Sequence, residues 1–229
     1  MKQRRNFLTI IIINNMFTAF IPVKENSERV KNKNFRIINE KPLFYYILNT
    51  LTAIKQITEM VIDHDTDKVR SEIEKYFDNL KFTKREKHLL DPHESVNKII
   101  EANLENFKNK FIFQTHVTNP LLTKETIESS ISKFLIHEES LFSVTKHQAR
   151  FYNSEIDPLN HDLDKLLSTQ HLEPWYEENS NFYIFSKNQF LKNNSRINQA
   201  SKIYIVSKTE SIDIDTEEDL ELVIKLKQK

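Results

Sequence analysis

The chain has 229 residues, enough for one α/β domain with a sizeable core. Its 33 basic and 33 acidic residues cancel, so the molecule as a whole has no field that would draw it to nucleic acid or to an anionic membrane. The absence of cysteine excludes disulfides, thiolate nucleophiles and cysteine-ligated zinc, and it fits a cytoplasmic protein.

Glycine is absent as well. Glycine normally supplies the left-handed backbone positions of tight turns, and asparagine tolerates them better than other residues that carry a side chain. We therefore expect asparagines to occupy such turns. The candidates are Asn14, Asn15, Asn32, Asn39, Asn193 and Asn194.

Residues 1–15 are interpreted as an N-terminal extension, and residues 16–229 as the domain. The stretch 2–13 is basic and then apolar, like the start of a signal peptide, but no small-residue cleavage site follows it. An extra strand, or a start codon placed upstream of Met16, explains it better. No apolar run reaches the ~20 residues that cross a bilayer, so no membrane association is expected.

Short β-rich segments alternate with amphipathic ones, a pattern typical of an α/β domain around a mixed, mainly parallel sheet. Strands are predicted at 17–21, 60–63, 111–114, 141–144, 182–185 and 203–206.

Four helices are predicted between and after these strands. The first begins with Pro42 at its first position and runs to Ile54. The others cover 95–107, a segment that Thr123 caps and that runs to Leu135, and 216–226.

Residues 148–178 differ from the rest because they are polar, contain two prolines and have only a brief helical pattern at 163–167. This segment is interpreted as an insertion, either a lid or a dimerisation segment. Trp175 and Tyr176 within it are candidates for covering a substrate or for packing a subunit interface.

Asp213 and Asp215 lie two residues apart among β-branched residues, just before the last helix. In a strand such residues point to the same face, and two carboxylates placed together favour a hard cation such as Mg²⁺ or Mn²⁺. The alternative is that Asp215 only caps the helix, with Glu218 completing a capping box. Capping does not explain Asp213.

A polar loop, residues 22–34, follows the first predicted strand, where α/β sheets commonly bind phosphates. Lys24, Arg29 and Lys33 could neutralise phosphate charge while Ser27 donates a hydrogen bond. A solvated loop is the alternative, since Glu25 and Glu28 dilute the positive charge.

Several segments, in order, resemble motifs of the acylneuraminate cytidylyltransferase family, which makes CMP-activated sialic acids and related sugar acids. The resembling segments are the loop 22–34, Asn39-Glu40-Lys41-Pro42-Leu43, 61–67, Arg85 with Leu89, Gln114 with 118–121, 178–183 and Asp213-Ile214-Asp215-Thr216. The resemblance implies a three-layer, Rossmann-like nucleotide-sugar transferase fold.

The resemblance also implies roles for individual residues. Lys24, Ser27, Arg29 and Lys33 would contact the phosphates of CTP, with Lys33 also catalytic. Asn34 and Arg85 would read the cytosine, Gln114 would lie near the sugar or the ribose, and Asn179 would bind the sugar acid. Arg150 is a candidate for the sugar acid on other grounds, because it follows a predicted strand and precedes the irregular segment, where a basic group could meet the substrate carboxylate; a surface role is the alternative. Asp213 and Asp215 would be catalytic and hold the metal, and the family implies a homodimer.

The chain departs from the family at some positions. The glycine pair of the first loop is Glu25-Asn26, and the family's N-G is Asn179-Ser180. Glycine allows close backbone approach to phosphate. Two alternatives stay open: a non-catalytic homologue that binds CTP or a CMP-sugar, and a nucleotidyltransferase that acts on KDO or another sugar.

Overall fold

Seven strands form the main sheet of the computed structural model, which describes residues 16–91 and 93–228. The interpretation of residues 1–15, Asn14 and Asn15 included, lies outside the described residues. The strands are β1 (Phe17–Val23), β4 (Ile57–His64), β5 (Lys81–Lys84), β6 (Phe111–Thr115), β7 (Leu141–His147), β8 (Trp175–Ser186) and β9 (Lys202–Val206). All six predicted strands are confirmed, and β5 was missed.

The strand order is β5-β4-β1-β6-β8-β7-β9. Strand β8 pairs antiparallel with both β6 and β7, whereas the remaining pairs are parallel. The sheet is therefore mixed and mainly parallel, as predicted. A separate two-stranded ribbon, β2 (Ile37–Ile38) with β3 (Lys41–Pro42), follows the loop after β1.

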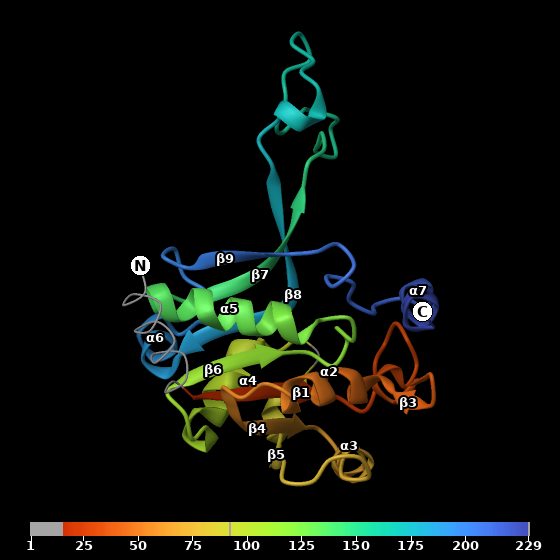
Figure 1. The fold of residues 1–229 in the computed structure, drawn as a ribbon, viewed down its shortest axis with the longest axis vertical. Helices are drawn as coiled ribbons and strands as arrows, with labels where there is room; N and C mark the ends of the chain where they lie inside the picture. Colours follow the sequence, from red (N-terminus) through yellow and green to blue (C-terminus); the bar gives the residue numbers. More distant parts are fainter. Residues whose placement is uncertain (1–15, 92, 229) are drawn as a thin grey trace, which may run out of the picture.

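Helices cover both faces of the sheet and give three layers (Figure 1). Buried residues of α2 (Leu43–Thr52), α3 (Asp67–Ile73) and α5 (Lys124–His137) pack with alternate residues of β1, such as Phe17 and Ile21. Phe20 points the other way, to α4 (Val96–Asn103) and α6 (Lys187–Asn193). This alternation is the period of two expected of a strand buried on both faces.

The helix termini differ from the predictions in detail. Pro42 is the N-cap of α2 rather than its first residue. The helix predicted over 95–107 is α4 followed by a 3-10 turn, Leu104–Asn106, and the cap by Thr123 is confirmed. The helical pattern at 163–167 was misleading, since the only turn of helix there is a 3-10 segment, Thr169–His171.

The last helix, α7 (Glu217–Lys227), is capped by Thr216 and Asp219, which form a capping box. The alternative that Asp215 and Glu218 cap it is wrong, because the carboxylate of Asp215 is held by basic residues instead. Helix α7 packs on α2 and β2 through a small core of Ile38, Leu43, Ile214, Leu220 and Val223.

An arm, residues 148–174, projects from the sheet between the ends of β7 and β8 (Figure 1). Residues 175–178, at the end of the predicted insertion, belong to β8 and pair with β7 as the base of the arm. The arm exposes apolar side chains that include Ile156, Leu163 and Leu166, at 76%, 56% and 65% exposure.

None of the helices in the described part of the chain combines the length and the apolar character needed to cross a membrane.

Left-handed backbone positions are occupied without glycine. Asn32, Asn39 and Asn194 have positive φ, as predicted, but the prediction for Asn193 is wrong, because this residue is the last one of α6. Positive φ also occurs at Glu40, Asn79, Glu138, Ile156 and Ser180. Asn39 (φ 43°) and Glu40 (φ 68°) form the two-residue turn between β2 and β3, where a type I′ turn requires positive φ at both positions. Asn-Gly is the sequence that best satisfies this requirement.

The Glu40→Gly variant should therefore stabilise the fold by about 0.5–1 kcal/mol, because it removes the left-handed strain of a residue with a Cβ. Urea unfolding of the two proteins measures the difference. The control is Glu101→Gly, an exposed position inside α4, which should lower the free energy of unfolding by about 1 kcal/mol. A loss of stability in Glu40→Gly would contradict the turn assignment.

Candidate active site

The carboxyl ends of β1, β4 and β6 meet at one edge of the sheet because the three strands are parallel neighbours. After β1 the chain adds β4 and β5 on one side, and it later places β6 on the other side. Such a switch in direction leaves a crevice beyond the carboxyl ends of the strands, where open α/β sheets bind ligands. The loops that follow these strands carry most of the residues predicted from the sequence.

The loop after β1 is held to the loop after β4. The backbone N–H of Glu25 donates to both carboxylate oxygens of Asp65, at 2.9 and 3.1 Å, and Lys68 pairs with the Glu25 carboxylate at 3.0 Å. Within residues 24–34, all of which the structure describes, only Asn32 has a positive φ. The backbone at Glu25-Asn26 therefore needs no glycine in this structure. Lys24 and Ser27 lie in the same loop, partly exposed.

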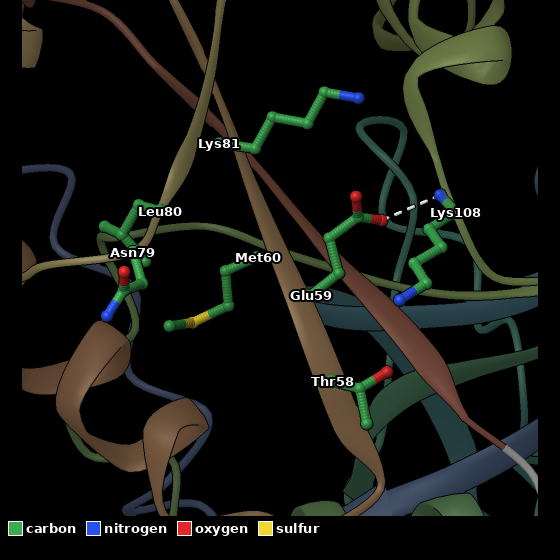
Figure 2. A pocket seen from close by; sticks show the side chains of 7 residues that line it. All are labelled: Thr58, Glu59, Met60, Asn79, Leu80, Lys81 and Lys108. Carbon is green, nitrogen blue, oxygen red and sulfur yellow. Dashed lines mark hydrogen bonds between the residues drawn. The ribbon is translucent and has the colours of Figure 1, made fainter.

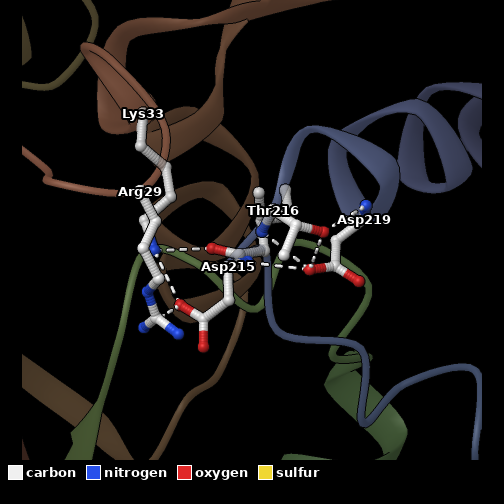
Figure 3. Close-up of polar contacts among 6 residues, drawn as sticks. Arg29, Lys33, Asp215, Thr216 and Asp219 are labelled. Carbon is white, nitrogen blue, oxygen red and sulfur yellow. Dashed lines mark hydrogen bonds and ion pairs between the residues drawn. The ribbon is translucent and has the colours of Figure 1, made fainter.

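Asp215 is the centre of the best-defined ion-pair cluster (Figure 3). Its Oδ1 atom accepts from Arg29 at 2.7 Å and from the Lys33 ammonium at 3.1 Å. Lys33 also donates to the carbonyl of Ile214, and its side chain is only 11% exposed. The basic loop and the segment before α7 thus meet at one carboxylate, and Arg29, 66% exposed, remains accessible to a ligand.

Asp213 lies beside this cluster, and its Oδ1 atom is buried without a hydrogen-bond partner. Ile214, between the two acids, donates its N–H to the carbonyl of Thr118 at 3.0 Å, so the pair lies next to the loop after β6. Burial, with the negative charge of Asp215 in addition, raises the pKa of the Asp213 carboxyl. A buried carboxylate oxygen without a donor is suited to binding a cation.

Asn34 lies in the 3-10 turn Lys33–Phe35, and Arg85 directly follows β5. The Asn34 amide donates to the carbonyl of Lys24 at 2.7 Å, and its Oδ1 is buried and has no partner. Arg85 follows β5 and pairs with Asp63 of β4, both side chains being 1% exposed. Arg85 Nη1 is also buried without a partner. One acceptor and one donor are therefore unsatisfied near the ends of β1 and β5.

Gln114 belongs to a polar cluster that the sequence did not reveal. Its Oε1 atom accepts from Arg196 at 2.5 Å, and its Nε2 atom lies 2.9 Å from Nε2 of His116. The guanidinium carbon of Arg196 lies 3.5 Å from the centre of the Tyr183 ring. Arg196 stands in a polar loop with no motif around it, so only its contacts identify it.

Two predicted substrate contacts are less closely joined to this edge. Asn179, in β8, is buried and donates to the hydroxyl of Thr145 at 3.1 Å. Arg150 is in the arm and donates to the carbonyl of Leu167 at 2.7 Å. Within one chain the structure thus ties Arg150 to the arm rather than to the cluster around Asp213.

A shallow pocket lies at the opposite, amino-terminal edge of β4 and β5 (Figure 2). Its lining residues are Thr58, Glu59, Met60, Asn79, Leu80, Lys81 and Lys108. The one acid among them, Glu59, already accepts from the Lys108 N–H at 2.8 Å and from Thr18 at 2.6 Å. None of the residues predicted for the site lines this pocket, so the candidate site is the carboxyl edge.

Comparison with known proteins gives consistent matches. A family model described as cytidylyltransferase matches residues 18–229. The chain is 25% identical over 215 residues to the pseudaminic acid cytidylyltransferase of Campylobacter jejuni, covering 89% of this chain and 92% of that protein. It is 27% identical over 223 residues to the CMP-N,N'-diacetyllegionaminic acid synthase of Legionella pneumophila, covering 91% and 94%.

The fold also matches a solved structure of CMP:2-keto-3-deoxy-manno-octonic acid synthetase complexed with CTP. The TM-score is 0.71, the sequence identity 13%, and the match covers 93% of this chain and 99% of that one. At this identity the match supports the fold alone.

The pKa of Asp213 gives a prediction about stability. Because its pKa in the fold is raised above the ordinary 3.8, the ionised carboxylate lowers stability at pH 7, and this cost disappears as the pH falls toward the ordinary value. Asp213→Asn should therefore raise the free energy of unfolding at pH 7, in metal-free buffer, by an amount of order 1 kcal/mol. Urea titrations at pH 7 and at pH ~4 measure the gain and its loss.

Asp215→Asn is the matched control. It leaves the buried Lys33 ammonium without its carboxylate, so it should lower stability by about 1–3 kcal/mol. Equal losses in the two variants would contradict the different environments of the two acids.

Proposed function

Because the chain belongs to the cytidylyltransferase family, we propose that it transfers CMP from CTP to the anomeric hydroxyl of a sialic-acid-like nonulosonic acid and releases pyrophosphate. The relatives named as pseudaminic acid cytidylyltransferase and as CMP-N,N'-diacetyllegionaminic acid synthase support this substrate class. The observation that carries the proposal is the convergence of Arg29 and Lys33 on Asp215, beside Asp213, at the carboxyl edge.

In this reaction the hydroxyl oxygen forms a bond to the α-phosphorus of CTP while the bond from that phosphorus to the pyrophosphate oxygen breaks. The hydroxyl proton passes to solvent. Negative charge grows on the departing pyrophosphate, and fixed positive charge stabilises it. Arg29, Lys24 and the N–H groups of the loop after β1 supply this charge, and Lys33 holds Asp215 in place.

A divalent cation, Mg²⁺ or Mn²⁺, fits the two acids. Asp213 has a buried oxygen with no partner. Arg29 and Lys33 both bind the Oδ1 atom of Asp215, and no described residue donates to its Oδ2 atom, which could bind the cation. Oxygen-only ligands are the set that these hard ions take. When bound, such an ion polarises the α-phosphate and lowers the pKa of a coordinated hydroxyl.

The cytosine would be read at the other end of the edge. The free Oδ1 of Asn34 can accept from the exocyclic amine of the base, and the free Nη1 of Arg85 can donate to its carbonyl or ring nitrogen. The bond from Arg85 to Asp63 fixes the guanidinium for this contact. The absence of cysteine fits action in the cytoplasm.

A screen of the four nucleoside triphosphates against pseudaminic, N,N'-diacetyllegionaminic, N-acetylneuraminic and 2-keto-3-deoxy-manno-octonic acids tests the function, read as Mg²⁺-dependent pyrophosphate release. We expect turnover with CTP and a nonulosonic acid only. Asp213→Ala should reduce the rate at least ~100-fold, while Glu59→Gln, at the opposite edge, should leave it unchanged.

Turnover with the octonic acid alone would assign the chain to that sugar. CTP binding without turnover in any combination would show a non-catalytic homologue. Full activity of Asp213→Ala would remove the metal assignment.

We further propose that two chains associate through the arm to form a homodimer. Half of the 16 large apolar side chains that are exposed in the described chain lie between Tyr152 and Tyr176. A single molecule does not bury them, and exposed apolar surface of this extent marks an interaction site. In a dimer the arm would bring Arg150 toward the neighbouring chain, where it could contact the bound sugar acid.

Replacing residues 149–173 by a short Asn-Ser linker should convert the dimer to a monomer, because it removes most of these apolar side chains. Light scattering measures the mass of both proteins. A quadruple change of exposed residues elsewhere, at Ile37, Leu90, Leu191 and Leu222 to Ser, should leave the mass unchanged. If the protein without the arm is still a dimer, the proposal is wrong.

A further inference from the structure

The guanidinium of Arg196 is held at the carboxyl edge by neutral groups. Arg196 lies in the loop after α6, and its own N–H donates to Asn97 at 3.4 Å. Nη1 donates to Gln114, and the planar group lies on the Tyr183 ring. Stacking on an aromatic ring fixes an arginine side chain without neutralising it.

Arg196 forms no ion pair in the part of the chain that the structure describes. Glu178, the acid whose charge it feels, accepts from the Tyr183 hydroxyl instead. Burial lowers the pKa of Arg196, which is the sign of a charge that is only partly compensated. Its Nε and Nη2 atoms make no hydrogen bond to described residues, and neither is among the fully buried polar atoms. They are therefore available to a ligand.

Gln114 has a fixed orientation because of Arg196. Arginine can only donate, so the atom that faces Nη1 is the amide oxygen. The amide nitrogen then faces His116 and donates to its Nε2, which must be unprotonated. In agreement, burial, helped by the charges of Arg196 and Lys33, lowers the pKa of His116 to about 3. Gln114 is itself fully buried, so it aligns Arg196 and does not contact a ligand.

The loop after β6 connects the contacts of Arg196 with those of the two acids. Gln114 is in β6, and four residues later the carbonyl of Thr118 binds the N–H of Ile214, between Asp213 and Asp215. Four residues span at most ~14 Å. A span of this length leaves room for the α-phosphate of CTP between the acids and a sugar acid whose carboxylate and anomeric hydroxyl both lie near Arg196.

We propose that Arg196, aligned by Gln114 and Tyr183, binds the carboxylate of the sugar acid and makes that carboxylate a determinant of specificity. The inference rests on the proposed function. A guanidinium offers two parallel N–H groups that match a carboxylate in plane and spacing, and charge-assisted pairs of this kind are among the strongest hydrogen bonds in proteins. In a nonulosonic acid the carboxylate is attached to the anomeric carbon, so holding it also orients the attacking hydroxyl.

Isothermal titration calorimetry of the full chain with each of the four sugar acids and with its methyl ester, in the presence of CMP, tests the proposal. For the wild type we expect the ester to bind at least tenfold more weakly than the acid. In Arg196→Gln the acid should bind at least tenfold more weakly than in the wild type, and the ratio of ester to acid dissociation constants should fall close to one. Arg196→Lys should keep part of the discrimination.

Gln114→Glu is a second variant, because it places a carboxylate of the chain on Arg196. It should also remove the preference for the acid over the ester while keeping Arg196 and its stacking. The control Arg70→Gln, an exposed arginine on α3, should leave the ratio unchanged. The dissociation constant of CTP should change less than twofold in every variant.

The inference is overturned if the wild type binds acid and ester equally, if it binds none of the acids, or if Arg196→Gln keeps the wild-type ratio. Failure of the proposed function is a separate result. A wild type that discriminates through Arg196 but releases no pyrophosphate would lose the enzymatic assignment and keep the carboxylate site.

Discussion

The attachment of Lys33 and Arg29 to Asp215 is the contact on which the candidate site depends. It joins residues 182 and 186 positions apart in the chain, and it fixes the loop after β1 against the segment before α7. Lys33 is nearly buried, so its positive charge needs the carboxylate and the Ile214 carbonyl that surround it. The same two parts of the chain are also joined by apolar contacts, in which Ile214, Leu220 and Val223 pack against Ile38 and Leu43. Ion pairing and core packing therefore both hold the loop after β1 against the segment before α7, and these two segments form one side of the site.

The two acids next to this junction have different environments. Asp215 is already satisfied by two cations, whereas Asp213 is buried beside it with an oxygen that nothing in the described chain satisfies. Thr216 and Asp219 already cap helix α7, so neither Asp213 nor Asp215 is needed as a cap. The cost of keeping Asp213 charged in the fold is therefore unexplained by stability, and the proposed cation would account for it.

A chain without glycine shows which backbone positions of this fold need left-handed residues. Asn39, Glu40 and Ser180 all have positive φ, and Ser180 stands where the family has the glycine of N-G. The corresponding pair in the loop after β1, Glu25-Asn26, does not have positive φ, and its shape comes from the hydrogen bonds of Glu25 N–H to Asp65. The prediction that asparagine would fill the turns was correct for Asn32, Asn39 and Asn194 and incomplete for the others, because position in a turn, and not residue type alone, imposes the conformation.

The sequence by itself determined six of the seven strands of the sheet and singled out the two acids before the last helix. Six strands, the cap at Thr123 and the pair Asp213 and Asp215 follow from local alternation, capping chemistry and spacing, which neighbouring residues impose on one another. The sequence did not predict β5, because a strand of four residues is defined by its partner strand. It predicted a helical pattern at 163–167 that does not form a helix, because an isolated pattern of this length has nothing to pack on. Only the tertiary structure decided that Asp215 pairs with Lys33, that Arg85 is held by Asp63 and that Arg196 stacks on Tyr183 and orients Gln114. These contacts join residues far apart in the chain, and no local pattern encodes which distant partner a charge will meet.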